Sequence, residues 1–78
     1  MTRRGVFHSL WVHWQRLRVD DAYAAWCDAN SRCGEALRAW MGADPAARRD
    51  AYHAYRAELE REEAAATELE LHARELAA

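Results

Sequence analysis

Lysine is absent from this chain of 78 residues, and proline, glycine and cysteine are scarce, with one, three and two residues respectively. All eleven basic residues are therefore arginine, and the heavy use of arginine and alanine is typical of a GC-rich bacterial genome. Cys27 and Cys33 are six residues apart, so on one helix their side chains would point about 240° from each other. We expect two reduced thiols and no disulfide, as in a cytoplasmic protein.

Long apolar runs are also missing. No stretch approaches the roughly 18 apolar residues of a membrane span. The apolar stretch after the N-terminal arginines is interrupted by His8, Ser9 and His13, and no small-residue cleavage site follows it, so we do not expect a signal peptide. A cytoplasmic location is the resulting expectation.

The patterns of known catalytic and metal sites are missing as well. His8 and His13 are five residues apart and diverge on a helix, and Glu68, His72 and Glu75 form at most a surface trio. No serine or cysteine has a histidine at the helical spacing that would activate it. We therefore expect a protein that is not an enzyme and that binds neither a metal ion nor a cofactor.

Two apolar seams with the same spacing are what the chain does contain. Sustained steps of three and four residues keep one stripe of a helix facing a partner. In the first half the seam consists of Val19, Tyr23, Trp26, Asn30, Cys33, Leu37 and Trp40. In the second half it consists of Tyr52, Tyr55, Leu59, Glu62, Ala66, Leu69, Ala73 and Leu76. The pattern predicts an all-α protein, an antiparallel helical hairpin with coiled-coil-like packing.

The segment 41–45 marks the bend between helices predicted at about 20–41 and 45–76. Gly42 is placed as a C-cap, Asp44 as an N-cap and Pro45 as the first residue of the second helix. Folding at this point brings Trp26 opposite Glu62, the one carboxylate in a seam. The same register brings Leu37 opposite Tyr52 and Cys33 opposite Tyr55.

Residues 1–18 form a separate basic and aromatic segment before the hairpin of residues 19–78. Its apolar positions predict a short helix over about 6–17, out of phase with the seam that starts at Val19. We expect a break near residues 18–20, and one continuous helix is the alternative. The second helix should outrun the first by roughly 15 Å, so the aromatic segment should cover its free end.

Charge is distributed unevenly around the net value of −2. Residues 1–19 carry a charge of +4 with no acidic residue, and residues 57–78 carry −5. We expect these ends to complement each other within the chain or between two copies. For the arginines and tryptophans of the N-terminal segment, packing over the hairpin is the first expectation. A membrane surface or a protein partner is the alternative, and the net charge argues against nucleic acid.

A two-helix hairpin of this size buries little surface, so we expect a second chain to complete it. The predicted arrangement is a homodimer in which two hairpins form a four-helix bundle. We expect a non-enzymatic interaction, accessory or adaptor module that binds an unidentified protein partner. The predicted interaction surface consists of Phe7, Trp11, Trp14, Arg16, Arg18, Trp26, Cys27 and Glu62.

The tripeptide Trp40-Met41-Gly42 at the bend resembles that of the small Trp-x-Gly proteins exported by type VII secretion systems. The resemblance covers this tripeptide and the hairpin architecture, and it implies a secreted helical hairpin that dimerises. His72-Ala73-Arg74-Glu75 does not match the tyrosine-x-x-x-acid export signal of that family. A secreted hairpin, or a module on a membrane surface, is therefore the alternative function.

Overall fold

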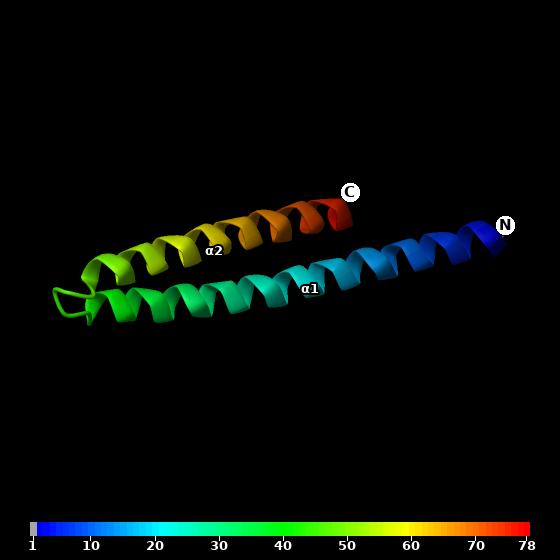
Figure 1. Ribbon diagram of the computed structural model, residues 1–78. Helices are drawn as coiled ribbons and strands as arrows, with labels where there is room; N and C mark the ends of the chain where they lie inside the picture. Colours follow the sequence, from blue (N-terminus) through cyan, green and yellow to red (C-terminus); the bar gives the residue numbers. More distant parts are fainter. Residues whose placement is uncertain (1) are drawn as a thin grey trace.

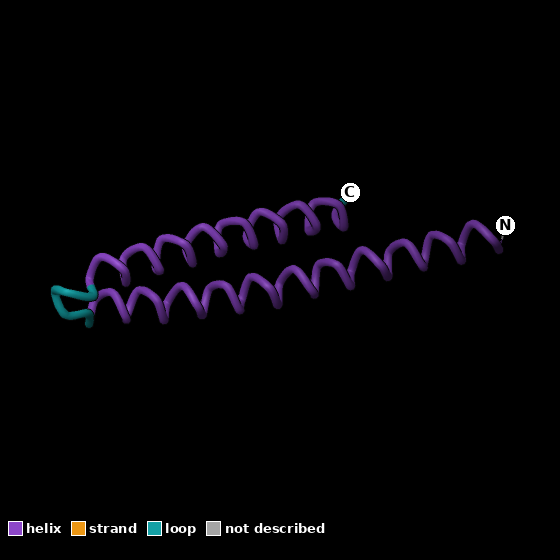
Figure 2. Tube along the Cα trace, in the orientation of Figure 1, coloured by secondary structure: helices purple, strands orange, loops and turns teal. Residues whose placement is uncertain are grey.

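The structure, a computed structural model, describes the backbone of residues 2–78 and the side chains of residues 9–78. It consists of two helices, α1 (Thr2–Met41) and α2 (Arg48–Ala77), which run antiparallel and pack along each other (Figures 1 and 2). The molecule measures 68 × 14 × 13 Å. The prediction of an all-α helical hairpin is confirmed.

Helix α1 is continuous from Thr2 to Met41, so the predicted break near residues 18–20 and the separate helix over 6–17 are wrong. The change of apolar phase in this region is real, but it does not require a break, because backbone hydrogen bonds hold a helix together whichever face is apolar. Residues 15–25 contain no glycine or proline, and Asp20 and Asp21 stay exposed inside the helix. The apolar stripe changes face while the helix runs on.

The turn is longer than predicted. The Ala43 N–H donates to the Trp40 carbonyl at 3.2 Å and ends α1, and none of the described glycines has a positive φ, so Gly42 does not form the left-handed cap. Asp44 accepts the Ala47 N–H through both its carbonyl (3.1 Å) and its side-chain Oδ1 (2.9 Å). This pair of bonds closes a separate turn over residues 44–47, so α2 begins at Arg48 and not at Pro45.

The contact between the helices follows spacings of three and four residues, as predicted. In α1 the half-buried or buried positions at this spacing, which we call the seam, are Val12, Gln15, Val19, Ala22, Trp26, Ala29, Cys33, Ala36 and Trp40. In α2 the seam consists of Ala51, Tyr55, Glu58, Glu62, Ala65, Leu69, His72 and Leu76. Every step in both series is three or four residues.

At every second position of this seam, the residue in the contact differs from the predicted one. Tyr23 and Asn30 are exposed, and their places are taken by the preceding alanines, Ala22 and Ala29. On α2, Tyr52 and Ala73 are likewise exposed, and the preceding residues lie in the seam. Alanine at every seventh position of α1 lets the two backbones approach closely, whereas the larger side chains fit at the edge of the contact.

Helix α1, with 40 residues, outruns α2, with 30 residues. The prediction that the second helix is the longer one is therefore wrong, because it followed from dividing α1 at residues 18–20. The N-terminal part of α1 projects past the end of α2 (Figure 1). No helix of the described residues is long and apolar enough to cross a membrane.

Little of the hairpin is buried. Among residues 9–78 only Ala29 falls in the buried class, at 9% exposure. The chain exposes 6378 Å², whereas a compact monomer of 9.0 kDa would expose about 4,900 Å². The radius of gyration is 18.6 Å, against about 11.5 Å for a compact domain of this length. The hairpin therefore leaves an excess of about 1,500 Å² of surface in contact with water.

Candidate interaction surface

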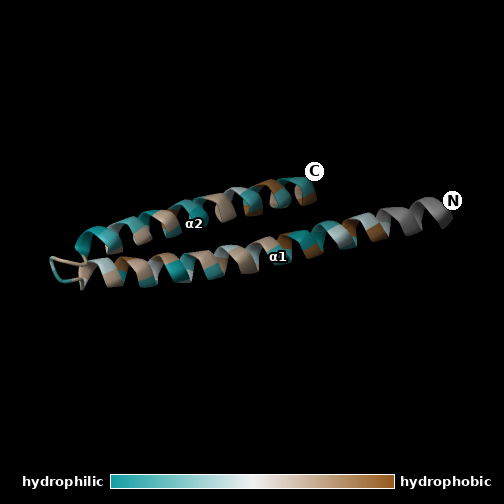
Figure 3. Cartoon of the chain, viewed as in Figure 1, coloured by the Kyte–Doolittle hydropathy of each residue, from teal (hydrophilic) through white to brown (hydrophobic). Residues whose placement is uncertain are grey.

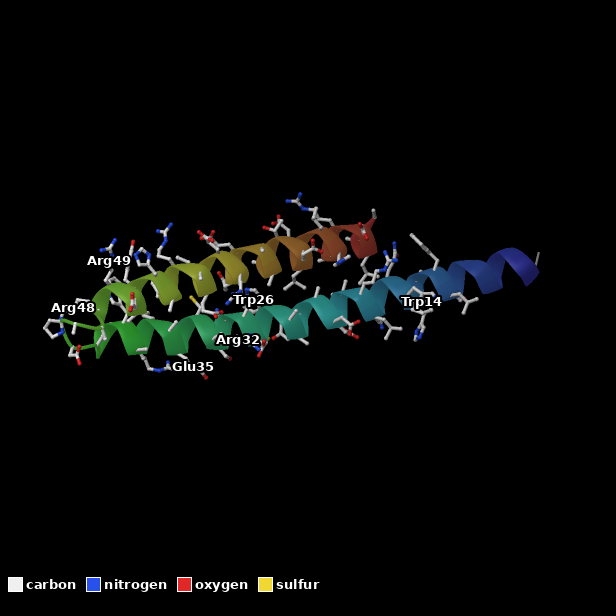
Figure 4. All side chains as sticks on the ribbon, viewed as in Figure 1. Trp14, Trp26, Arg32, Glu35, Arg48 and Arg49 are labelled. Atoms are coloured by element: carbon white, nitrogen blue, oxygen red, sulfur yellow. The ribbon has the colours of Figure 1, made fainter. Side chains whose placement is uncertain are left out.

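Three residues of the predicted interaction surface, Trp26, Cys27 and Glu62, lie together at mid-length of the hairpin. The Trp26 indole lies between the helices (Figure 4), and its Nε1–H donates to Glu62 Oε1 at 2.9 Å. The predicted pairing of these two residues is confirmed. Cys27 is half-buried and its thiol is free, as is that of Cys33.

Tyr23 completes this cluster, although its side chain is 56% exposed. Its ring lies 6.1 Å from the Trp26 ring, centroid to centroid. A hydrogen bond with the Cys27 side chain, together with the charge that this thiol acquires on ionisation, raises the pKa of Tyr23 above its usual value of 10.0. Sequence reasoning placed Tyr23 inside the seam and so missed it as a surface residue.

A second aromatic cluster lies near the turn. The Trp40 ring lies 5.0 Å from that of Tyr52 and is stacked at 5.6 Å on that of Tyr55. The predicted partners of these tyrosines were Leu37 and Cys33, so Trp40 is one or two helical turns away from the expected contacts. Since Trp26 still pairs with Glu62 as predicted, this difference is confined to the end of the hairpin near the turn, where α2 starts three residues later than predicted.

Both clusters lie on one side of the hairpin, which we call the tyrosine side. The Trp40–Tyr52 contact crosses between the helices on this side. The side is formed by the residues that directly follow every second seam residue, beginning with Gln15 on α1 and Ala51 on α2. These positions are Arg16, Tyr23, Asn30 and Leu37 on α1, with Tyr52, Leu59, Ala66 and Ala73 on α2. Arg16 is the one charged residue among these eight.

The opposite edge of the seam, the charged side, has a different composition. Its positions directly precede the remaining seam residues, and five of the nine are charged. They are Trp11, Arg18, Ala25, Arg32 and Ala39 on α1, with Ala54, Arg61, Glu68 and Glu75 on α2. The two sides of the hairpin therefore differ strongly in the number of charged residues that they expose.

The remaining predicted interaction residues lie on the N-terminal part of α1. Trp11 and Trp14 are 56% and 60% exposed, so they do not pack over the hairpin as first expected. Arg16 lies on the tyrosine side, whereas Arg18 lies one turn after Trp14. Phe7 lies outside the residues whose side chains the structure describes.

Polar residues occupy two seam positions of α2 that sequence reasoning left out. Glu58 Oε1 accepts a hydrogen bond from Arg61 at 2.6 Å, while its Oε2 is buried without a partner. His72 Nε2 lies 3.4 Å from Glu68, and its Nδ1 lies 3.7 Å from Glu75 and has no hydrogen bond. The predicted trio of Glu68, His72 and Glu75 is thus present. No group of three described side chains is arranged to hold a metal ion.

The charged ends of the chain do not pair directly with each other. All five ion pairs of the described residues join side chains three or four positions apart on one helix. The expected complementarity between the basic N-terminal segment and the acidic end of α2 is therefore not realised as salt bridges within the hairpin. In the described part of the chain, Arg16 and Arg18 form none.

The tripeptide Trp40-Met41-Gly42 lies at the end of α1, where Gly42 donates a helical hydrogen bond to Arg38 at 3.0 Å. Met41 is 77% exposed at the same end of the hairpin. Comparison with models of protein families, with curated proteins and with solved structures gave no match. The candidate surfaces are therefore interpreted from their own chemistry.

Proposed function

We propose that this chain is a non-enzymatic helical interaction module that binds a second copy of itself through its tyrosine side. Two hairpins joined in this way form a four-helix bundle, and the 3–4 spacing of each seam supports packing of the coiled-coil type. The observation that carries the proposal is the exposed area of 6378 Å².

The excess surface is large enough to supply a specific interface. About 1,500 Å² more is exposed than a compact monomer of this mass would expose. A standard interface buries about 800 Å² on each partner. Covering one flank of the hairpin would therefore remove about half of the excess, and a second copy offers a matching surface through a two-fold axis.

The number of charged residues on each side favours the tyrosine side as the interface with the second copy. Seven of the eight flanking residues on the tyrosine side are uncharged, so an interface there desolvates few ions. The charged side would bring five charged residues of each copy into contact. The core of a stable interface is depleted of charge and enriched in aromatic residues, which favours the side that contains Tyr23 and Tyr52.

The test is the mass of the protein in solution, measured by sedimentation equilibrium over a range of concentrations. We expect twice the chain mass of 9.0 kDa for the native sequence. Tyr23→Glu should give the monomeric mass, because it places two carboxylates in the interface, and it should leave the helicity unchanged because Tyr23 is exposed. Ala25→Glu, on the charged side of the same helix, is the matched control and should remain dimeric.

A native chain that is monomeric at every concentration would overturn the proposal, and a different protein would then have to cover the tyrosine side. A dimer that tolerates Tyr23→Glu but dissociates with Ala25→Glu would show that the opposite flank is the interface.

A further inference from the structure

We propose that residues 2–18 of α1, which we call the arm, bind an anionic membrane surface. Residues 12–18 of the arm lie beside the end of α2, where Gln15 Nε2 donates to the Glu75 carbonyl at 3.5 Å. Residues 2–11 extend past that end, because α1 has ten residues more than α2. This difference corresponds to about 15 Å of free helix. The hydropathy colouring shows apolar positions that continue along α1 past the end of α2 (Figure 3).

The apolar residues of the arm point away from the seam. Leu10 and Trp14 flank the seam residue Val12 at a distance of two positions, and Leu17 precedes Val19 by two. Two residues correspond to about 200° around a helix. This stripe, consisting of Leu10, Trp11, Trp14 and Leu17, is exposed throughout. The hairpin therefore leaves a face of tryptophan and leucine uncovered.

The charge of the arm identifies the chemistry of the surface that would cover it. Residues 1–19 carry four arginines and no acidic residue, whereas the rest of the chain carries a net −6. Arg18 lies one turn after Trp14, on the same face of the helix. In the described part of the chain neither Arg16 nor Arg18 has a salt-bridge partner. A surface rich in phosphate or carboxylate groups would supply the missing negative charge.

A lipid surface fits this combination better than the acidic end of a second copy does. Tryptophan rings favour the headgroup level of a bilayer, with leucine below them and arginine reaching the phosphates. Two glutamates of the acidic end, Glu58 and Glu70, already pair with arginines of their own helix, and Glu68 and Glu75 face His72. No described helix is apolar enough to span a bilayer, so the arm would lie in the interface.

The experiment is the sedimentation of the full chain with phosphatidylcholine vesicles, with and without phosphatidylserine. We expect binding to the vesicles that contain phosphatidylserine and a decrease of binding with added salt. Replacing both Trp11 and Trp14 by alanine should lower the partition coefficient at least about tenfold. Arg18→Gln should lower it about fivefold, the effect of one basic residue near such a surface.

Two matched controls lie on α2. Leu71 is 48% exposed on its outer face, and Arg56 is exposed without an ion pair among the described side chains. Leu71→Ala and Arg56→Gln should leave vesicle binding unchanged. Tyr23→Glu, which tests self-association, should not abolish vesicle binding, so the two proposals can fail separately.

Three results would overturn the inference. The first is an absence of binding to the anionic vesicles, and the second is binding that survives the double tryptophan substitution. The third is found without lipid: if the fluorescence contributed by Trp11 and Trp14 resists quenching by acrylamide, another protein chain already covers the stripe.

Discussion

The hydrogen bond between Trp26 and Glu62 offers the most direct test of the hairpin, because it joins the two helices at mid-length. The donor and acceptor atoms are 2.9 Å apart and both residues are half-buried. A hydrogen bond to a charged group contributes about 1.5–3 kcal/mol to stability. Since this pair is partly exposed to solvent, we expect about 1–1.5 kcal/mol.

A double-mutant cycle isolates this contribution. Trp26→Phe removes the N–H donor and keeps an aromatic ring, while Glu62→Ala removes the acceptor. The free energy of unfolding lost in the double variant should be smaller than the sum of the two single losses by about 1–1.5 kcal/mol. Glu62→Gln keeps an acceptor oxygen without the charge, so it should lose less stability than Glu62→Ala.

The assay is urea unfolding followed by far-ultraviolet circular dichroism, with all variants at one protein concentration, because self-association would change the apparent stability. A loss of 1 kcal/mol should also lower Tm by roughly 4–8 °C in a chain of this size. Glu63→Ala, at the exposed neighbouring position, is the control and should change little. A coupling below about 0.3 kcal/mol would refute the register, because independent sites behave in that way.

Four further predictions concern single positions. Gly34→Ala should raise the free energy of unfolding by about 0.5–1 kcal/mol, because the new Cβ would meet only the end of an arginine side chain, at 3.5 Å; a lower Tm would contradict this. Asp44→Ala should lower stability by about 1 kcal/mol in urea unfolding, because its side chain accepts a backbone N–H of the turn. Arg48→Glu should raise Tm by an amount equivalent to about 0.3–1 kcal/mol, because it replaces a positive charge at the positive end of the α2 dipole, and high salt should reduce the gain. Cys27→Ala should lower the pKa of Tyr23 toward 10.0, as followed by NMR of the tyrosine ring carbons during a pH titration.

Much of the architecture was predictable from local patterns. The bend at Gly42, Asp44 and Pro45 combines residues that end one helix and start another, and the seams on either side repeat at three and four residues. These signals suffice for two antiparallel helices and for the pairing of Trp26 with Glu62. They do not predict the first residue of α2, because its position depends on the turn in which both the carbonyl and the side chain of Asp44 accept the Ala47 N–H.

The candidate surfaces were predicted only in part. Trp11, Trp14 and Arg18 were recognised as a possible surface, but the expected cover over the tryptophans depended on a break that α1 does not contain. Tyr23 and Tyr52 were assigned to the seam because large apolar residues are usually buried. The signal that could have corrected this is the seven-residue spacing of Ala22, Ala29 and Ala36.

By itself, the sequence determined that the chain forms two helices and turns once, since capping residues and apolar periodicity act through neighbours along the chain. Only the tertiary structure decided which of two adjacent stripes each helix buries. Both stripes have the same period, so periodicity cannot choose between them, and the choice depends on how closely the two backbones approach. Alanine occupies alternate layers of the α1 seam, and Tyr23, Tyr52 and the tryptophans of the arm are left at the surface.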